Sequence, residues 1–239
     1  MVDKEKKIGY NIIMDRKIEQ IIRDSVERSK IQRKEFVIFD RVIVHLLQPT
    51  VISFAEVISR LEEKVPQHMF DEIDEIFVGS FDENDNRALE AHYEHGAIYI
   101  TNDMVTIEDY VENIIHEAAH SIEQARGFEI YGDQKIQEEF LGKRMTLKRT
   151  LATNGHNTDA DFGEIEYSED FDLYLYKEVG YDEIGNLTSG LFYSPYAATS
   201  VNEYFANGLE NFFLGDREHL NRISPKLTKK IWEIINDEI

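Results

Sequence analysis

The sequence predicts an α+β fold in which a small twisted sheet packs against helices. Two short apolar runs bordered by glycine, 76–79 and 96–100, are typical of strands. A stretch at 106–127 carries apolar residues at helical spacing over its whole length, and a second stretch, 196–213, does so nearer the C-terminus. We expect these four elements to form the centre of the fold.

Residues 1–48 are expected to form an N-terminal helical extension. Apolar positions recur at helical spacing among many charges from residue 17 to residue 47. The last part, 36–47, is rich in β-branched residues and fits a strand equally well. Gln48-Pro49 is a plausible break, because the residue before a proline is pushed out of the helical region. The boundary is therefore placed there, with one domain at 49–239.

This domain is expected to open with a helix at 51–64, which Pro66 closes. The two strands follow it. The helix after them begins at Thr106, which forms a capping box with Asp109, and it is expected to end at Gly127. Its apolar stripe is wide enough to face a core and consists of Tyr110, Val111, Ile114, Ile115, Ala118, Ala119 and Ile122.

The C-terminal half is expected to be mainly helical. Residues 134–151 favour a helix, and 152–167 favour a polar loop. Ser194-Pro195 suits the start of a helix, so we expect a single helix from Tyr196 to Phe213. A last helix is expected at 224–235.

The composition excludes several kinds of site and partner. The chain has 239 residues and no cysteine, so it has no disulfides, and any transition metal must be held by His, Asp or Glu. Its 47 acidic and 26 basic residues give a formal charge of −21, which repels phosphate backbones, and nucleic acid is not an expected partner. No apolar run approaches the roughly 18 residues of a membrane span, and Met1–Asn11 lacks the features of a secretory signal. We expect a soluble chain that does not engage a membrane.

The motif His116-Glu117-Ala118-Ala119-His120 lies in the middle of the predicted helix 106–127. Residues four apart on a helix lie one above the other, so both imidazoles can converge on one ion. Glu117 then stands beside the metal, where it can take a proton from the attacking water. The spacing predicts a catalytic Zn²⁺ site with His116 and His120 as ligands and Glu117 as the general base.

A catalytic zinc site of this kind needs a third protein ligand, and two histidines with a glutamate are a recurrent set. Glu203 is the candidate, on a helix whose other face is strongly apolar. A second interpretation remains open, because Ser200 and Glu203 also have capping-box spacing. If the helix begins at Ser194-Pro195, however, Glu203 lies in its third turn and the capping interpretation weakens.

Two more residues on this segment are candidates for the site. Tyr196 lies seven residues before Glu203, so on one continuous helix both side chains point the same way. A phenol there can donate a hydrogen bond to the oxyanion that forms during acyl transfer; the alternative is a core aromatic. Asn207, one turn beyond Glu203, could accept a hydrogen bond from the outer nitrogen of a ligating histidine, or it could be an exposed helical asparagine.

These residues resemble the zinc peptidases typified by the catalytic domain of anthrax lethal factor, a family that includes the clostridial proline-proline endopeptidases. The matching residues are His116-Glu117-Ala118-Ala119-His120 and the later segment in which Tyr196 precedes Glu203. The resemblance covers about residues 50–220. It implies a zincin-like fold, zinc bound by His116, His120 and Glu203, Glu117 as general base, and Tyr196 as the oxyanion donor.

The resemblance also implies hydrolysis of a peptide bond in a peptide or protein substrate. In such enzymes the edge strand of the sheet pairs with the substrate main chain, and Ala97, Ile98, Tyr99 and Ile100 are the expected strand. The gap between His120 and Glu203 is longer than in the smallest members, so 129–188 is expected to be an insertion. Members without export signals occur in bacterial and phage genomes, which favours a cytoplasmic or virion-associated protein.

Two alternatives of other classes remain open. A binding or virion-associated structural protein could keep the fold without turnover; its signature would be loss of Glu117 or Tyr196, and both residues are present. An enzyme with a non-peptide substrate is the other.

Overall fold

The computed structural model describes residues 34–81 and 90–236, and from Phe36 onward the described chain forms one compact unit. The part of the expected helical extension that falls on residues 1–33 lies outside the described residues. Within the described ranges the fold is α+β, as predicted, with a small mixed sheet of five strands.

The sheet has the order β1-β2-β3-β5-β4. The strands are β1 (Lys34–Ile38), β2 (Val42–Leu46), β3 (Glu75–Val78), β4 (Ala91–Glu94) and β5 (Ala97–Ile100). β2, β3 and β5 run parallel, and β4 returns antiparallel to β5. Both strands predicted from apolar runs are thus confirmed, as β3 and β5.

Residues 34–38 and 42–46 are strands joined by a turn at 39–41, and they are not part of a helical extension. The sequence left 36–47 open between helix and strand, and the structure decides for the strand. Main-chain pairing explains this outcome, because β2 lies parallel to β3 with Val44 opposite Ile76, and both side chains are fully buried. The domain boundary expected after Gln48 therefore lies just after β2 in the sequence, and β1 and β2 belong to the same sheet as the later strands.

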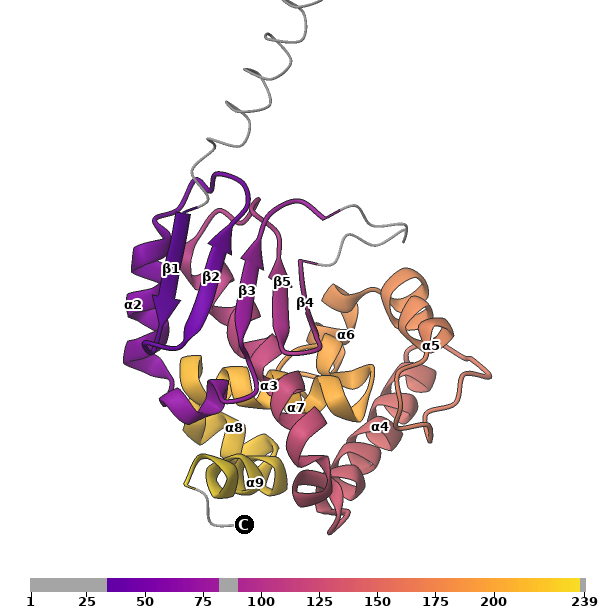
Figure 1. Cartoon of the computed structure of the whole chain (residues 1–239). Helices are drawn as coiled ribbons and strands as arrows, with labels where there is room; N and C mark the ends of the chain where they lie inside the picture. Colours follow the sequence, from indigo (N-terminus) through magenta and orange to yellow (C-terminus); the bar gives the residue numbers. More distant parts are fainter. Residues whose placement is uncertain (1–33, 82–89, 237–239) are drawn as a thin grey trace, which may run out of the picture. The chain divides into compact units, whose positions relative to one another are not determined.

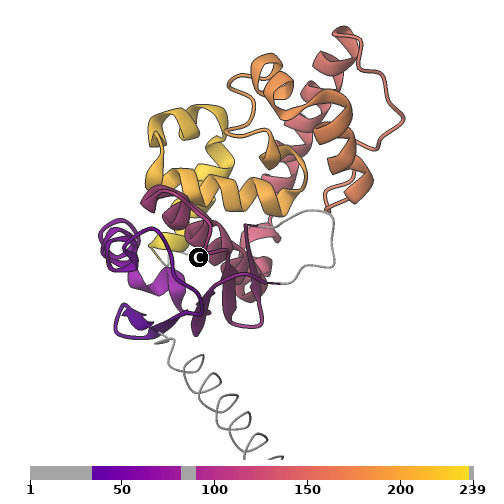
Figure 2. The ribbon, with the colours of Figure 1, turned by 90° about the horizontal axis from the view of Figure 1, so that it is seen from above.

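Helices cover one face of this sheet (Figures 1 and 2). α2 (Phe54–Lys64), the short 3₁₀ turn η1 (Gln67–Phe70) and α3 (Ile107–Tyr131) follow the predicted pattern of buried apolar positions. The predicted stripe of α3 is buried throughout, and Ala118 and Ala119 leave room for a neighbouring helix to approach closely. That helix is α7 (Val201–Leu214), which makes the most extensive contact with α3.

The capping box of α3 is present: Asp109 N–H donates to Thr106 Oγ1 at 3.0 Å, and Thr106 N–H donates to Asp109 Oδ2 at 3.1 Å. The helix expected to end at Gly127 is kinked directly before that residue, where Arg126 has non-helical angles (φ −119°, ψ 21°), and a further helical piece then continues to Tyr131. This kinked last turn matters for the site described below, since it carries Tyr131.

The segment expected to be an insertion, 129–188, contributes to the core. It contains α4 (Lys135–Thr153), α5 (Glu169–Leu173), the π-helical turn η2 (Tyr174–Val179) and α6 (Tyr181–Leu187). The expected helix at 134–151 and loop at 152–167 are confirmed by α4 and the irregular chain after it. α4 packs against α3, α7 and the C-terminal helix, and buries Ile136, Phe140, Leu147 and Leu151.

The expected single helix from Tyr196 to Phe213 is broken. A 3₁₀ turn, η3 (Tyr196–Ala198), precedes α7, whose N-cap is Ser200 in extended conformation (φ −154°, ψ 167°). Two helices, α8 (Arg217–Ile223) and α9 (Pro225–Ile235), close the described chain, the second as predicted. No helix in 34–81 or 90–236 combines the length and apolar character that a membrane crossing requires.

Candidate metal centre

The packing of α3 against α7 brings together three side chains that the sequence predicted as ligands. His116 and His120 project from one face of α3, and Glu203 projects from the first turn of α7. One ligand atom from each residue lies within 4.8 Å of the other two. The three residues form a His-His-Glu group that could hold a metal ion.

The Nε2 atoms of both histidines face the Glu203 carboxylate. His116 Nε2 lies 3.0 Å from Oε2, and His120 Nε2 lies 3.7 Å from Oε1. The two imidazole centroids are 5.1 Å apart with ring planes at 77°, so the rings converge without stacking. All three side chains are partly buried, with exposed fractions of 15 to 23%. Each of the three side chains therefore keeps some contact with solvent.

The outer nitrogens of the histidines are held by two glutamates that the sequence interpretation missed. His120 Nδ1 lies 2.9 Å from Glu123 Oε2, and His116 Nδ1 lies 3.5 Å from Glu210 Oε2. Carboxylates in this position fix the ring orientation and tautomer of a ligating histidine. Asn207 was expected to accept from a histidine; instead its amide donates to Glu210 at 3.5 Å, so it contacts the site only through that glutamate. Glu210 is one further turn along α7, where a carboxylate reaches farther than the shorter asparagine.

Glu123 is itself firmly held. Its Oε1 accepts hydrogen bonds from the Tyr131 hydroxyl and from Asn202 Nδ2, the latter at 3.0 Å. Its side chain is only 5% exposed. Burial raises the pKa of Glu123, while the hydrogen bonds with His120, Tyr131 and Asn202 oppose that rise. The spacing of three from His120 on one helix was the signal that could have found this residue.

Glu117 is almost fully buried beside the histidines. Burial raises its pKa, against the attraction of His120 and His116 and a hydrogen bond with the backbone of Tyr93. A carboxylate whose pKa is moved toward neutrality suits proton transfer near physiological pH. The contact with Tyr93 also places this side chain next to β4.

The electrostatic environment favours a cation. Burial acts to lower the pKa of His116, but its hydrogen bonds with Glu203 and Glu210 outweigh that effect and raise the pKa to about 10. Burial also acts to lower the pKa of His120, but the hydrogen bond and charge of Glu123 together with the charge of Glu203 raise it. The carboxylates around the two rings therefore stabilise positive charge at this point, whether it is carried by protons or by a divalent ion.

Tyr196 does not share a helix with Glu203, because the chain breaks at Ser200. Ser200 Oγ accepts from Glu203 N–H at 3.1 Å, which is half of the alternative capping interaction. The Glu203 carboxylate, however, faces the histidines and not the Ser200 backbone. The Tyr196 ring lies in the 3₁₀ turn before this break, partly buried, with its centroid 6.2 Å from that of Tyr181.

The expected substrate strand, 97–100, is not an edge. β5 pairs with β3 on one side and with β4 on the other, so both of its main-chain rows are occupied. The edge of the described sheet on this side is β4, which packs against α3. Ala91–Glu94 has no apolar run that would predict a strand; it forms β4 by pairing with β5 across the turn at His95 and Gly96.

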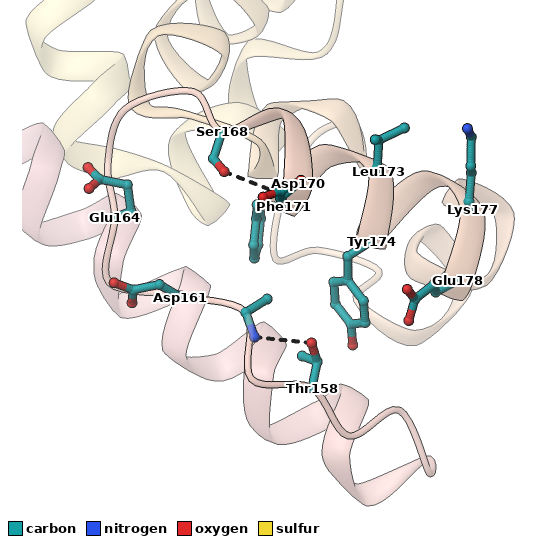
Figure 3. A pocket seen from close by; sticks show the side chains of 11 residues that line it. Thr158, Asp161, Glu164, Ser168, Asp170, Phe171, Leu173, Tyr174, Lys177 and Glu178 are labelled. Atoms are coloured by element: carbon teal, nitrogen blue, oxygen red, sulfur yellow. Dashed lines mark hydrogen bonds between the residues drawn. The ribbon is translucent and has the colours of Figure 1, made fainter.

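A surface hollow of about 630 Å³ lies between the loop after α4 and the α5–η2 segment (Figure 3). None of the residues predicted for the site lines it. Acidic side chains from the loop and from η2 line its rim, and Phe171 and Tyr174 supply apolar walls. The hollow is therefore separate from the His-His-Glu group.

Comparisons with protein-family models, with curated proteins and with solved structures find no match for this chain. The resemblance to the lethal factor group thus stays a prediction carried by the motif residues.

Proposed function

We propose that this protein is a zinc-dependent endopeptidase of the zincin type, which hydrolyses peptide bonds in a peptide or protein substrate. The observation that carries the proposal is the convergence of His116, His120 and Glu203, with Glu117 buried beside them. Structural zinc sites usually have four protein ligands, whereas catalytic sites have three and leave one position open. A group of three ligands therefore favours a catalytic site.

The donor set supports zinc as the metal. Two neutral imidazoles and one carboxylate are a ligand set found in zinc hydrolases, and the outer carboxylates Glu123 and Glu210 support the histidines. A bound zinc ion would supply the positive charge that acidifies water and polarises the scissile carbonyl.

Glu117 is the proposed general base. It would accept a proton from the attacking water and pass it to the leaving amine, for which its buried position and raised pKa are suited. Tyr196 is the proposed donor to the developing oxyanion; this role is supported by the resemblance to the lethal factor group and not by a helix shared with Glu203, since η3 and α7 are separate. The roles are separate: Glu117 moves a proton, and Tyr196 stabilises charge.

The substrate main chain would pair with β4, since this strand is the described edge nearest Glu117. Tyr93, on β4, hydrogen-bonds Glu117 through its backbone, so a peptide added along this edge would pass beside the base. Main-chain pairing at a sheet edge gives affinity with little dependence on side chains.

The proposal is tested by screening a peptide library with the purified, zinc-reconstituted protein. We expect chelator-sensitive cleavage, about one zinc per chain, and loss of cleavage in Glu117→Gln without loss of zinc. Glu129→Gln is the matched control, because Glu129 lies on the same helix and its exposed side chain pairs with Arg126 away from the histidines. Zinc loss in Glu117→Gln, or cleavage that persists in it, would rule out the assigned role.

A further inference from the structure

We propose that Arg144 and Tyr181, both in the segment 129–188, are positioning residues that set the place of the Tyr196 side chain. The inference rests on the proposed function for its catalytic consequence, although the positioning itself can be measured without any activity. It gives the long segment between His120 and Glu203 a role at the site.

Arg144 is bound to the backbone that directly follows Tyr196. Its side chain lies on α4 and is 1% exposed. One guanidinium nitrogen, Nη1, donates to the carbonyls of Ala198 at 2.8 Å and Thr199 at 3.2 Å, and Nη2 donates to the carbonyl of Asp161 at 3.2 Å. The fork therefore ties the end of η3 to α4 and to the loop after α4.

The guanidinium is further fixed by aromatic rings. Its Cζ lies 3.7 Å from the centroid of the Phe171 ring, and Phe140 and Phe162 approach it as well. Figure 3 shows Phe171 on α5 and Asp161 on the facing loop, so these partners of Arg144 come from two separate segments of the chain. Arg144 has no carboxylate within salt-bridge distance among the described residues, and burial lowers its pKa to about 10. The charges of Asp161 and Glu164 oppose this effect of burial from a longer distance.

Arg144 binds the chain at a break between two helical segments. The turn η3 is three residues long, and the chain leaves helical geometry at Ser200 before α7 begins. The carbonyls of Ala198 and Thr199 fall at this break, where a regular helix would have satisfied them internally. A planar donor fork that reaches several carbonyls at once is a property of arginine that lysine lacks.

Tyr181 supports the ring of Tyr196 from a second direction. The two ring centroids are 6.2 Å apart with planes at 69°, an edge-to-face contact. The Tyr181 hydroxyl donates to Asp172 Oδ1 at 2.5 Å, and Asp172 is fully buried. The Tyr181 ring is therefore anchored at its far end while its body contacts Tyr196.

The positioning is tested by ¹⁹F NMR of protein labelled with 3-fluorotyrosine and loaded with zinc. The Tyr196 resonance is assigned as the one lost in Tyr196→Phe. We expect this resonance to shift or broaden in Arg144→Lys and in Tyr181→Leu. The resonance should not move in Arg149→Lys, which changes an exposed residue of α4. It should also not move in Leu147→Ala, which shortens a buried side chain on the same helix. The last variant controls for lowered stability.

Steady-state kinetics on a cleavable peptide supplies the catalytic consequence. Misplacing a reacting group by about 1 Å can lower the rate about 100-fold, so we expect kcat to fall about 10- to 100-fold in Arg144→Lys. KM and zinc content should change less than about threefold. In a Tyr196→Phe background the same substitution should cost almost nothing more, because the positioned group is already removed.

The outcomes separate this inference from the proposed function. An unmoved Tyr196 resonance in both variants, or equal losses of kcat with and without Tyr196, would overturn the positioning role. A displaced resonance in a protein that cleaves no peptide would keep the positioning and overturn the peptidase proposal. If Arg144→Lys does not fold, Tyr181→Leu carries both measurements.

Discussion

Replacing Glu123 by glutamine is expected to weaken metal binding about 10- to 100-fold. Glu123 accepts three hydrogen bonds: one from His120 Nδ1 on Oε2 at 2.9 Å, and those of Tyr131 and Asn202 on Oε1. A glutamine amide has one acceptor oxygen, and we expect Tyr131 and Asn202 to donate to it as they do to Oε1 of Glu123. The amide NH₂ then faces His120 Nδ1, which must give up its proton to accept.

That change of tautomer is the source of the loss. The proton then lies on His120 Nε2, the nitrogen that faces Glu203. This nitrogen can bind a cation only after it has lost that proton. Loss of an outer-shell partner typically costs 10- to 100-fold in metal affinity, which is about 1.4 to 2.7 kcal/mol. Glu123 is buried, so solvent cannot replace its contact with the ring.

The assay is competition between the protein and a chelator of known zinc affinity at fixed pH. Glu129→Gln serves as the control for removing one negative charge from the same helix. Thermal unfolding of the metal-free proteins shows whether the substitution disturbs the fold. An affinity within twofold of wild type, with the fold intact, would refute the reasoning that Glu123 sets the His120 tautomer.

Three further substitutions test the oxyanion role, a buried lysine and a close helix contact. Tyr196→Phe should lower kcat about 10²- to 10³-fold with little change in KM, zinc content or melting temperature; a kcat within twofold of wild type would return Tyr196 to a packing role. Burial lowers the pKa of Lys143 to about 8, from 10.5, so the charged form is disfavoured in the fold. Relative to Lys143→Met, wild-type stability should therefore rise by about 3 kcal/mol as the pH increases from 8 to 10.5, and a difference independent of pH in denaturant titrations would contradict this. Gly208→Ala should destabilise by about 1 to 3 kcal/mol, because its Cβ would overlap the Leu227 side chain where α7 meets α9; unchanged urea unfolding would show that α9 can move aside.

The sequence alone determined those parts of the site that lie within one helix. The spacing of His116 and His120 places both rings on one face whatever surrounds them, because the geometry of a helical turn is local. The capping box at Thr106 and the buried stripe of α3 were predictable for the same reason. Glu203 could be found only as a carboxylate of suitable chemistry downstream, and the structure brings it to the histidines.

Tertiary packing decided the rest. Whether 36–47 is helix or strand depends on β3 being available for pairing, and β4 exists as a strand because β5 supplies its partner. The break before α7 is set by Ser200 and the contacts around it, which outweigh the favourable start at Ser194-Pro195. Glu210 lies near His116 because α7 packs against α3, which the sequence of either helix does not reveal. Periodicity reports which side of an element is buried, whereas the partner it is buried against depends on residues far away in the chain.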